Sequence, residues 1–240
     1  MRLLRFNALN EPVLRARTGV LLAGDVVGDL RAGYATYLVE ETKDPQGRDI
    51  AGLRIPPDVR HILHVGEAAR SALELAATWL GRRYASAPDS KGVDGELLFV
   101  PLSGARLHNP LKPGRLLVVK GNTGSGGPVS VQDRSSATVI GPVRDIAMPA
   151  ALDALTYGTG LAIVIGRTCH GLEARNALGV VAGYMVANDV NAMPSNADAE
   201  DLAGDTAFHR CIIGPYLVDA RDVPDIHTLR LTTRVNGVVV

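Results

Sequence analysis

Two pairs of residues spaced two apart attract attention, because that spacing places side chains on one face of a β-strand. His209 and Cys211, in "FHRC", could form a base and a nucleophile, since a nearby imidazole can take the proton of a thiol. The alternative is a small buried cysteine beside a polar edge residue, because free cysteine usually behaves as a packed hydrophobe. The second pair, Gly158 and Gly160 in "LTYGTGLAIVIGR", leaves the start of an apolar strand pattern without side chains.

Two further patterns lack a part that their chemistry needs. The stretch "GNTGSGG" at 121–127 follows a strand pattern as a phosphate-binding loop does, yet no Gly-Lys-Ser/Thr ending and no helix pattern follow it. We therefore predict a flexible loop there. His61 and His64 could share a ligand in a helix, but no third ligand lies near them in the sequence, so we favour solvent-exposed histidines.

Composition limits the classes of function. Of the 240 residues, 46% are hydrophobic, which is enough for a core and argues against disorder. The 25 Lys and Arg residues balance 25 Asp and Glu residues, so we expect neither nucleic acid nor a membrane surface as a partner. No apolar run is long enough for a membrane span, and the first residues lack a signal peptide's apolar segment. The two cysteines, Cys169 and Cys211, favour a reducing compartment, and we expect a cytoplasmic protein.

The elements that would position these residues divide the chain into two regions. Residues 1–95 read as a small β-rich region of short strands with one helix, which Asp58 can cap. The apolar residues of this predicted helix recur at spacings of three and four from Ile62 to Leu80. The stretch 85–96, "ASAPDSKGVDGE", has the composition of a linker.

The second region, residues 96–240, contains several strand patterns rich in β-branched residues. One helix pattern interrupts them, "GLEARNALGVVAGY" at 171–184. Many strands with few helices predict an α+β, β-rich fold, with a smaller N-terminal β/helix region, and not a repeated βαβ array.

The end of the chain predicts a hairpin. In "RVNGVVV" an Asn-Gly pair lies between β-branched runs, which is typical of a type I′ turn. The second strand would stop at Val240, soon after it starts, so we expect the second region to be incomplete at its C-terminus. An incomplete sheet would have an exposed edge that needs a partner to cover it.

Several motifs in a fixed order together resemble the fumarylacetoacetate hydrolase family. They are "LAIVIGR", "VAGYMVANDVNA", "IIGPYLV" and "DVPDIHTLRLTTRVNG". The resemblance implies a mixed β-roll that is usually a homodimer. It also implies hydrolysis, decarboxylation or isomerisation of small oxo-acids and dioic acids, with Mg²⁺ or Ca²⁺ stabilising the enolate that forms.

The resemblance also implies a metal site that lacks most of its ligands. Where the family has Tyr-Glu-x-Glu, with both glutamates on the metal, this chain has Tyr157, Gly158 and Gly160. The third ligand is retained as Asp189, which is either a vestigial metal ligand or a turn residue. A single carboxylate is a poor ligand set for Mg²⁺, which gives up water reluctantly. We therefore expect no cofactor, with weakly bound Mg²⁺ or Ca²⁺ as the alternative.

The family's acid–base groups have no counterparts at their usual positions. A histidine normally follows "RLLVVKG" and is missing here, and Asp205 stands where the family has a lysine. Asp205 and His209 are the remaining candidates for acid–base catalysis, acting from positions that the family does not use.

A substrate-binding role is carried over to a second set of residues. Arg134, Ser135 and Ser136 fall where the family has "KPSSAVIG", and a cation with hydroxyl groups could hold a carboxylate there. An ordinary strand start is an equal alternative. The space left by Gly158 and Gly160, next to Tyr157, could admit the rest of the ligand.

Three functions remain open. The favoured one is a repurposed or inactive homologue that binds a small oxo-acid-like carboxylate, as a homodimer or as the partner subunit of an intact family member. The second is an active C–C hydrolase, decarboxylase or isomerase for small 2-oxo or 2-hydroxy dioic acids, using Asp205, His209 or Arg134. The third is a structural or regulatory partner in a hetero-oligomer. The combined loss of metal-binding and acid–base groups favours the first.

Overall fold

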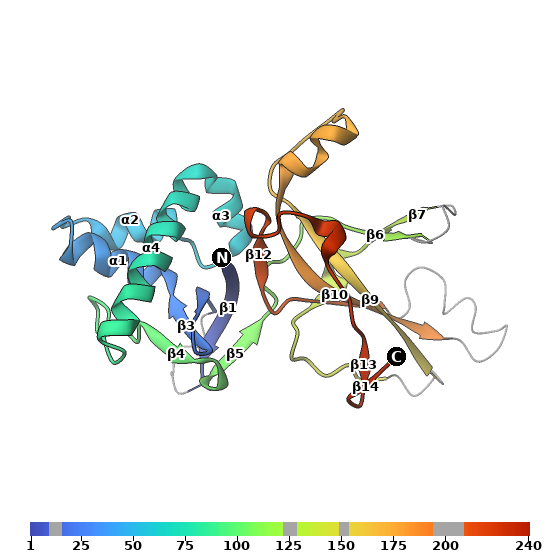
Figure 1. Ribbon diagram of the computed structural model, residues 1–240, viewed down its shortest axis with the longest axis horizontal. Helices are drawn as coiled ribbons and strands as arrows, with labels where there is room; N and C mark the ends of the chain where they lie inside the picture. Colours follow the sequence, from blue (N-terminus) through green and yellow to red (C-terminus); the bar gives the residue numbers. More distant parts are fainter. Residues whose placement is uncertain (10–15, 122–128, 149–153, 194–208) are drawn as a thin grey trace.

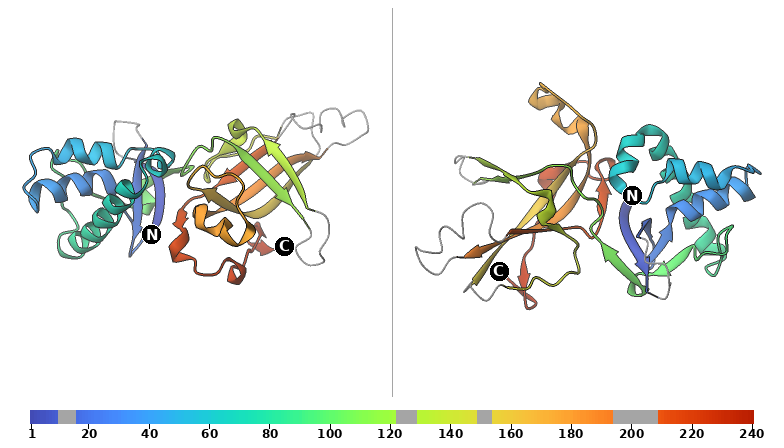
Figure 2. Two further views of the ribbon diagram at one scale, coloured as in Figure 1. Left: turned by 90° about the horizontal axis from the view of Figure 1, so that it is seen from above. Right: turned by 180° about the vertical axis from the view of Figure 1, so that it is seen from behind.

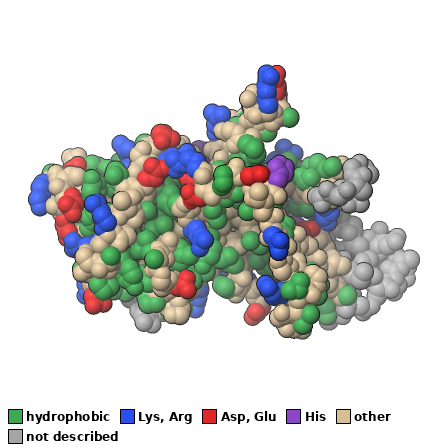
Figure 3. All heavy atoms as spheres, in the orientation of Figure 1, with side chains coloured by type: hydrophobic (Ala, Val, Ile, Leu, Met, Phe, Trp, Pro, Cys, Tyr) green, Lys and Arg blue, Asp and Glu red, His purple; other side chains and the backbone are tan. Residues whose placement is uncertain are grey.

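The computed structural model describes residues 1–9, 16–121, 129–148, 154–193 and 209–240. Figure 1 shows two lobes: one contains the helices, and the other contains the longest strands. Ten strands form a mixed sheet, so the predicted α+β, β-rich fold is confirmed. None of the described helices combines the length and apolar character needed to cross a bilayer. On the face in Figure 3, basic and acidic side chains are interspersed, without a large area of one sign.

Four helices cover the N-terminal strands, so the prediction of one helix in residues 1–95 is wrong. They are α1 (Leu30–Glu40), α2 (Gly47–Arg54), α3 (Val59–Val65) and α4 (Glu67–Ser86). Asp58 caps α3, as expected, by accepting a hydrogen bond from the Arg60 N–H at 2.8 Å. The expected single helix is nevertheless two, because Gly66 has a φ of 73°, and this left-handed conformation interrupts the helix between Val65 and Glu67.

The main sheet runs through both lobes. Its order is β4-β3-β2-β1-β12-β10-β11-β8, with β5 beside β1 and β9 beside β10. The strands of this sheet are β1 (Arg2–Ala8), β2 (Arg17–Leu22), β3 (Val26–Asp29), β4 (Phe99–Pro101), β5 (Ala105–His108), β8 (Val139–Ile140), β9 (Ala154–Ile165), β10 (Val181–Met193), β11 (His209–Ile213) and β12 (Leu217–Asp219). All pairs are antiparallel except the parallel pair β8–β11.

Two two-stranded sheets complete the described strands. Strands β6 (Leu116–Lys120) and β7 (Ser130–Arg134) form a separate two-stranded sheet. Strands β13 (Arg234–Val235) and β14 (Val238–Val239) form the predicted C-terminal hairpin. Its central residues have φ values of 51° and 84°, and positive φ at both positions agrees with the type I′ turn that Asn-Gly predicts.

The expected boundary at residue 95 does not separate two sheets. Strand β4 pairs with β3, and β5 pairs with β1, so residues 99–108 continue the N-terminal sheet. Strand β1 also pairs with β12, near the C-terminal end of the chain. The views in Figure 2 show β1 and its neighbours at the junction of the lobes. The lobes are therefore joined by the backbone pairing of β1 with β12, whereas the predicted linker 85–96 connects α4 to β4 within the N-terminal lobe.

The predicted helix over 171–184 is wrong. Residues Ala174–Val180 form a short 3₁₀ helix, η3, and Val181 already begins β10. Strand β10 pairs with β9 along almost its whole length, and this long-range pairing overrides the local helical pattern. Gly183 lies where β10 crosses close to β12, and a Cβ there would collide with the carbonyl oxygen of Val218.

Candidate functional site

Three neighbouring strands bring predicted site residues onto one face of the sheet. Strand β10 lies between β9 and β11, and Asp189 pairs with Gly158 on one side and Cys211 on the other. Directly opposed residues of antiparallel strands point the same way, and every second residue shares that face. Gly160 and His209 therefore lie on the same face as Asp189.

Three side chains hold the carboxylate of Asp189, which is 15% exposed. Lys120 Nζ lies 3.2 Å from Asp189 Oδ2, and Asn191 Nδ2 donates a hydrogen bond to the same oxygen at 3.0 Å. His209 Nε2 contacts Oδ1. Burial by itself raises the pKa of Asp189, but the hydrogen bonds from Asn191, His209 and Lys120 outweigh burial and hold this pKa below its usual value. The carboxylate is therefore ionised at neutral pH.

His209 is 5% exposed and has an acceptor at each ring nitrogen. Nε2 faces Asp189, and Nδ1 lies 3.0 Å from Thr138 Oγ1. The Thr138 hydroxyl donates its own proton to the Ser135 carbonyl at 2.7 Å, so Thr138 Oγ1 is left to accept from the histidine. Contacts from β10 and from the turn before β8 thus fix the orientation of the imidazole.

The described residues do not fit a divalent cation. Asp189 provides one carboxylate, Gly158 and Gly160 provide no donor, and an ammonium group already lies beside Asp189. Across the described parts of the chain, no three His, Cys, Asp or Glu side chains are arranged so that they could hold a metal ion. Mg²⁺ and Ca²⁺ need several oxygen ligands, and the charge of Lys120 would repel either ion.

Lack of room does not explain the missing ligands. A Cβ at Gly158 would be 3.6 Å from the Asp189 carbonyl oxygen, an ordinary contact, and a Cβ at Gly160 would have nothing within 4 Å. Side chains would therefore fit at both positions, and only the residue type removes the donors.

Cys211 is a buried thiol. Burial, and then the charge of Asp189, raise its pKa to about 11. A thiol with this pKa stays protonated at neutral pH, so the pairing of His209 and Cys211 as base and nucleophile finds no support. Its burial beside hydrophobic neighbours agrees with the alternative of a packed cysteine.

Tyr157 does not lie with the two glycines, which corrects that part of the predicted ligand site. Strand alternation places its side chain on the face of β9 opposite to Gly158 and Gly160, and the residue is 51% exposed. Asp205 falls within 194–208, outside the described residues. The glycine-rich stretch is likewise outside them from position 122 onward.

Arg134, Ser135 and Ser136 contribute to the turn between β7 and β8. Arg134 Nη2 donates to Gln132 Oε1 at 2.8 Å, at the end of β7. Ser135 Oγ accepts from the Ala137 N–H at 3.3 Å, and this cap begins a 3₁₀ turn at Ser136–Thr138. Among the described contacts, the Ser135 hydroxyl group meets the Ala137 N–H and not the Asp189 carboxylate, whereas the Thr138 hydroxyl group contacts His209.

Sequence reasoning missed Lys120 and Thr138. Lys120 ends an apolar strand pattern, "RLLVVK", and Thr138 follows two serines in a turn. Neither residue has a spacing that connects it to Asp189, because their contacts with the cluster are made across the fold. A charged residue at the end of an apolar run was the one available signal.

Comparison with known proteins identifies the source of these motifs. Residues 128–240 match the family model described as "Fumarylacetoacetate (FAA) hydrolase C-terminal". The mitochondrial oxaloacetate tautomerase FAHD2B of Homo sapiens is 33% identical over 108 residues, which cover 44% of this chain and 34% of that protein. The chain thus matches about a third of the length of this curated relative.

Solved structures resemble larger parts of the chain. The 2-hydroxyhepta-2,4-diene-1,7-dioate isomerase of Mycobacterium marinum is 29% identical, with a TM-score of 0.50, and the match covers 59% of this chain and 55% of that one. The maleylpyruvate hydrolase of Sphingobium sp. SYK-6 has a TM-score of 0.57 and 22% identity, over 94% of this chain and 69% of its own. The second likeness supports the fold alone.

Proposed function

Because this chain belongs to the fumarylacetoacetate hydrolase family, we propose that it binds a small oxo-acid or related carboxylate beside Asp189, with Lys120 in place of a divalent cation. The observation that carries the proposal is the 3.2 Å ion pair between Lys120 and Asp189, formed where Gly158 and Gly160 provide no metal ligands. In this proposal the chain is a repurposed member of its family.

Lys120 can bind a ligand without leaving Asp189. An ammonium group has three donors, and its side chain is 48% exposed, so donors remain for a carboxylate or keto oxygen from solvent. Asp189 stays ionised and holds the ammonium in place. Hydrogen bonds between charged groups of this kind are short and about twice as strong as neutral ones.

A second candidate is an active isomerase or tautomerase that does not need a metal. The ionised carboxylate of Asp189, held by the buried His209, is the acid–base group that supports it. The reaction would remove a proton from the carbon next to the keto group and return one to the keto oxygen. Lys120 would stabilise the enolate oxygen that forms in between. Isomerase and tautomerase are activities named among the relatives.

We also propose that the chain pairs with another subunit of its family, either a second copy or an intact member. Among the described strands, β9 pairs only with β10 and leaves its other edge open. An open edge of a 12-residue strand is a surface that proteins usually cover. A third role, as a purely structural or regulatory subunit, would require such pairing without ligand binding.

The two cysteines are free thiols, Cys169 exposed and Cys211 buried, and free thiols support the proposal of a cytoplasmic setting.

Calorimetric titration with pyruvate and oxaloacetate, before and after EDTA treatment, tests the proposal. We expect binding that is insensitive to EDTA and weakened about tenfold by Lys120→Met. Lys91→Met, in an exposed turn, is the matched control and should leave binding unchanged. Turnover assays of oxaloacetate and an acylpyruvate on the same samples decide between binder and enzyme. Turnover that EDTA abolishes and Mg²⁺ restores would overturn the proposal.

A further inference from the structure

We infer that the ligand of the Lys120–Asp189 site is an oxo-acid with an apolar chain or ring, not a compact polar one such as pyruvate. The inference rests on the proposed function and adds the class of ligand. It comes from a cavity that adjoins the site and that the site residues described above do not use.

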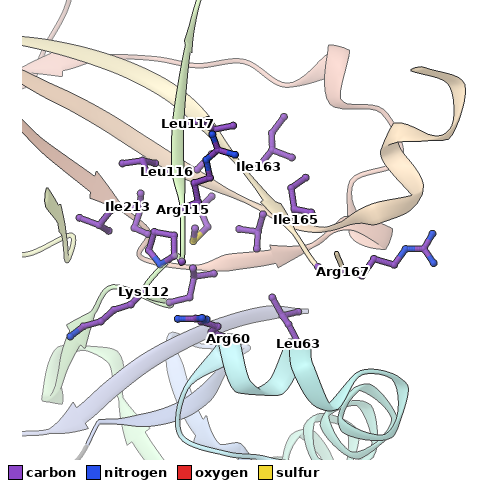
Figure 4. Close-up of a pocket in the computed structure, with 18 of the residues that line it drawn as sticks. Arg60, Leu63, Lys112, Arg115, Leu116, Leu117, Ile163, Ile165, Arg167 and Ile213 are labelled. Atoms are coloured by element: carbon purple, nitrogen blue, oxygen red, sulfur yellow. The ribbon is translucent and has the colours of Figure 1, made fainter. Parts of the chain in front are cut away.

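The cavity has a volume of about 660 Å³ and lies between α3, β6 and the sheet formed by β9, β10 and β11 (Figure 4). This volume is within the range of small-molecule sites, roughly 300–1,000 Å³. Its walls are mainly aliphatic and include Leu63, Leu111, Leu116, Val164, Met185 and Ile213. Pyruvate would fill little of it, and water against aliphatic walls is unfavourable.

The cavity and the Asp189 cluster occupy one face of the sheet. Along β10, Met185 lines the cavity, and Asp189 follows four residues later on the same face. Along β11, Ile213 lines the cavity, and His209 lies four residues away on that face. Four residues of strand span about 13 Å. A ligand of that length could therefore contact both ends.

Within the described parts of β9 and β10, the residues between the two ends are small. The facing residues between Met185 and Asp189 are Ala187 and its partner Gly160, and a Cβ at Gly160 would have nothing within 4 Å. On β6, Leu116 lines the cavity, and Lys120, four residues later on the same face, binds Asp189. The small residues leave space for a ligand chain to pass from the charged group to the aliphatic walls.

The charged residues that line the cavity are all basic: Arg60, Lys112, Arg115 and Arg167. Arg115 pairs with Asp133 at 2.8 Å. Figure 4 shows Lys112 at the lower left, Arg60 at the bottom beside Leu63, and Arg167 at the right of the labelled residues. With no acidic residue in the lining, the cavity favours an anion and disfavours a ligand with a cationic tail.

A series of 2-oxo acids of increasing length tests the inference: pyruvate, 2-oxobutanoate, 2-oxohexanoate and 2-oxooctanoate. We expect the dissociation constant, measured by calorimetry on the full chain, to fall by about fourfold for each methylene buried. Leu117, an exposed residue of β6, is part of the cavity wall, so Leu117→Glu places a charge there. This variant should remove the increase in affinity with the chain length of the 2-oxo acid. Leu53→Glu, on the far exposed side of α2, is the matched control.

The two proposals fail in different ways. Equal affinity for pyruvate and 2-oxooctanoate, both weakened by Lys120→Met, would overturn the apolar-ligand inference and leave the proposed function standing. An increase in affinity with 2-oxo acid chain length that Leu117→Glu does not alter would also overturn the apolar-ligand inference. No binding of any 2-oxo acid by a folded protein, as judged by circular dichroism, would overturn both.

Discussion

The ammonium group of Lys120 lies 3.2 Å from the carboxylate of Asp189, although the two residues belong to different sheets. Lys120 ends β6 in the separate hairpin, and Asp189 lies in the middle of β10. The pair puts a positive charge beside the carboxylate to which the family resemblance assigns the role of a metal ligand. The first prediction below depends on this contact.

Adding carboxylates at Gly158 and Gly160 should create a site for a divalent cation beside Asp189. The variant Gly158→Glu/Gly160→Glu/Lys120→Met places three carboxylates on one face and removes the competing ammonium. We expect its affinity for Mn²⁺, measured by electron paramagnetic resonance, to exceed that of the original chain by tenfold or more, because charge count sets the affinity for hard cations.

The matched control for that experiment is Tyr157→Glu/Lys120→Met. It adds a carboxylate on the same strand but on the opposite face, so it should not create the site. Equal Mn²⁺ affinity in the control and in the triple variant would show that the affinity does not depend on which face of β9 carries the added carboxylates.

Removing the Thr138 hydroxyl group should destabilise the fold, because His209 loses a hydrogen-bond partner. In Thr138→Val the histidine Nδ1 loses its acceptor, so we expect a fall of about 1 kcal/mol in the free energy of unfolding, measured by urea denaturation. When Thr138→Val is combined with His209→Phe, the two losses in the free energy of unfolding should not add, because the two residues share one contact. Fully additive effects in this double-mutant cycle would contradict the hydrogen bond.

The two thiols should differ in reactivity. Cys169 is exposed, whereas Cys211 is buried with a pKa raised to about 11. At pH 7.5, iodoacetamide should label Cys169 and leave Cys211 unmodified in the native protein, since the thiolate is the reactive form. Peptide mass spectrometry reads the outcome, and unfolding in urea before labelling supplies the positive control. Comparable labelling of both native thiols would refute the buried, protonated state.

Asp219 should contribute to acid sensitivity. Arg221 Nη2 lies 3.1 Å and Arg70 Nη2 lies 3.9 Å from Asp219 Oδ2, so the carboxylate links β12 to α4. Burial raises the pKa of Asp219, but the hydrogen bonds and charge of Arg221 outweigh it and leave this pKa below its usual value. Because the folded pKa is depressed, the stabilisation is fully present above pH ~4, the unfolded value, and is lost as pH falls through the folded value.

Asp219→Asn should therefore lower the free energy of unfolding by about 1–3 kcal/mol at pH 7 and flatten its fall in acid. Asp94→Asn, which removes an exposed partner of Arg48, is the control and should change stability much less. Chemical denaturation at pH 7, 5 and 3 provides the curves. An unaltered acid dependence in Asp219→Asn would count against the role of this carboxylate.

The amino-acid sequence by itself indicated the resemblance to the fumarylacetoacetate hydrolase family, the β-rich class, the C-terminal turn and the absence of carboxylates at Gly158 and Gly160. These features are local: a motif, an Asn-Gly pair and a residue type can each be read without knowing what lies nearby in space. The sequence also indicated Asp189 and His209 separately, but not their contact.

The tertiary structure decided the rest, because the decisive contacts join distant segments. Helix α1 escaped prediction since most of its residues are buried, which removes the apolar periodicity of a surface helix. The pattern at 171–184 became a 3₁₀ turn and a strand because β9 was available to pair with Val181 onward. Lys120 and Thr138 joined the site only when β6 and the turn before β8 packed against β10 and β11, which no spacing along the chain encodes.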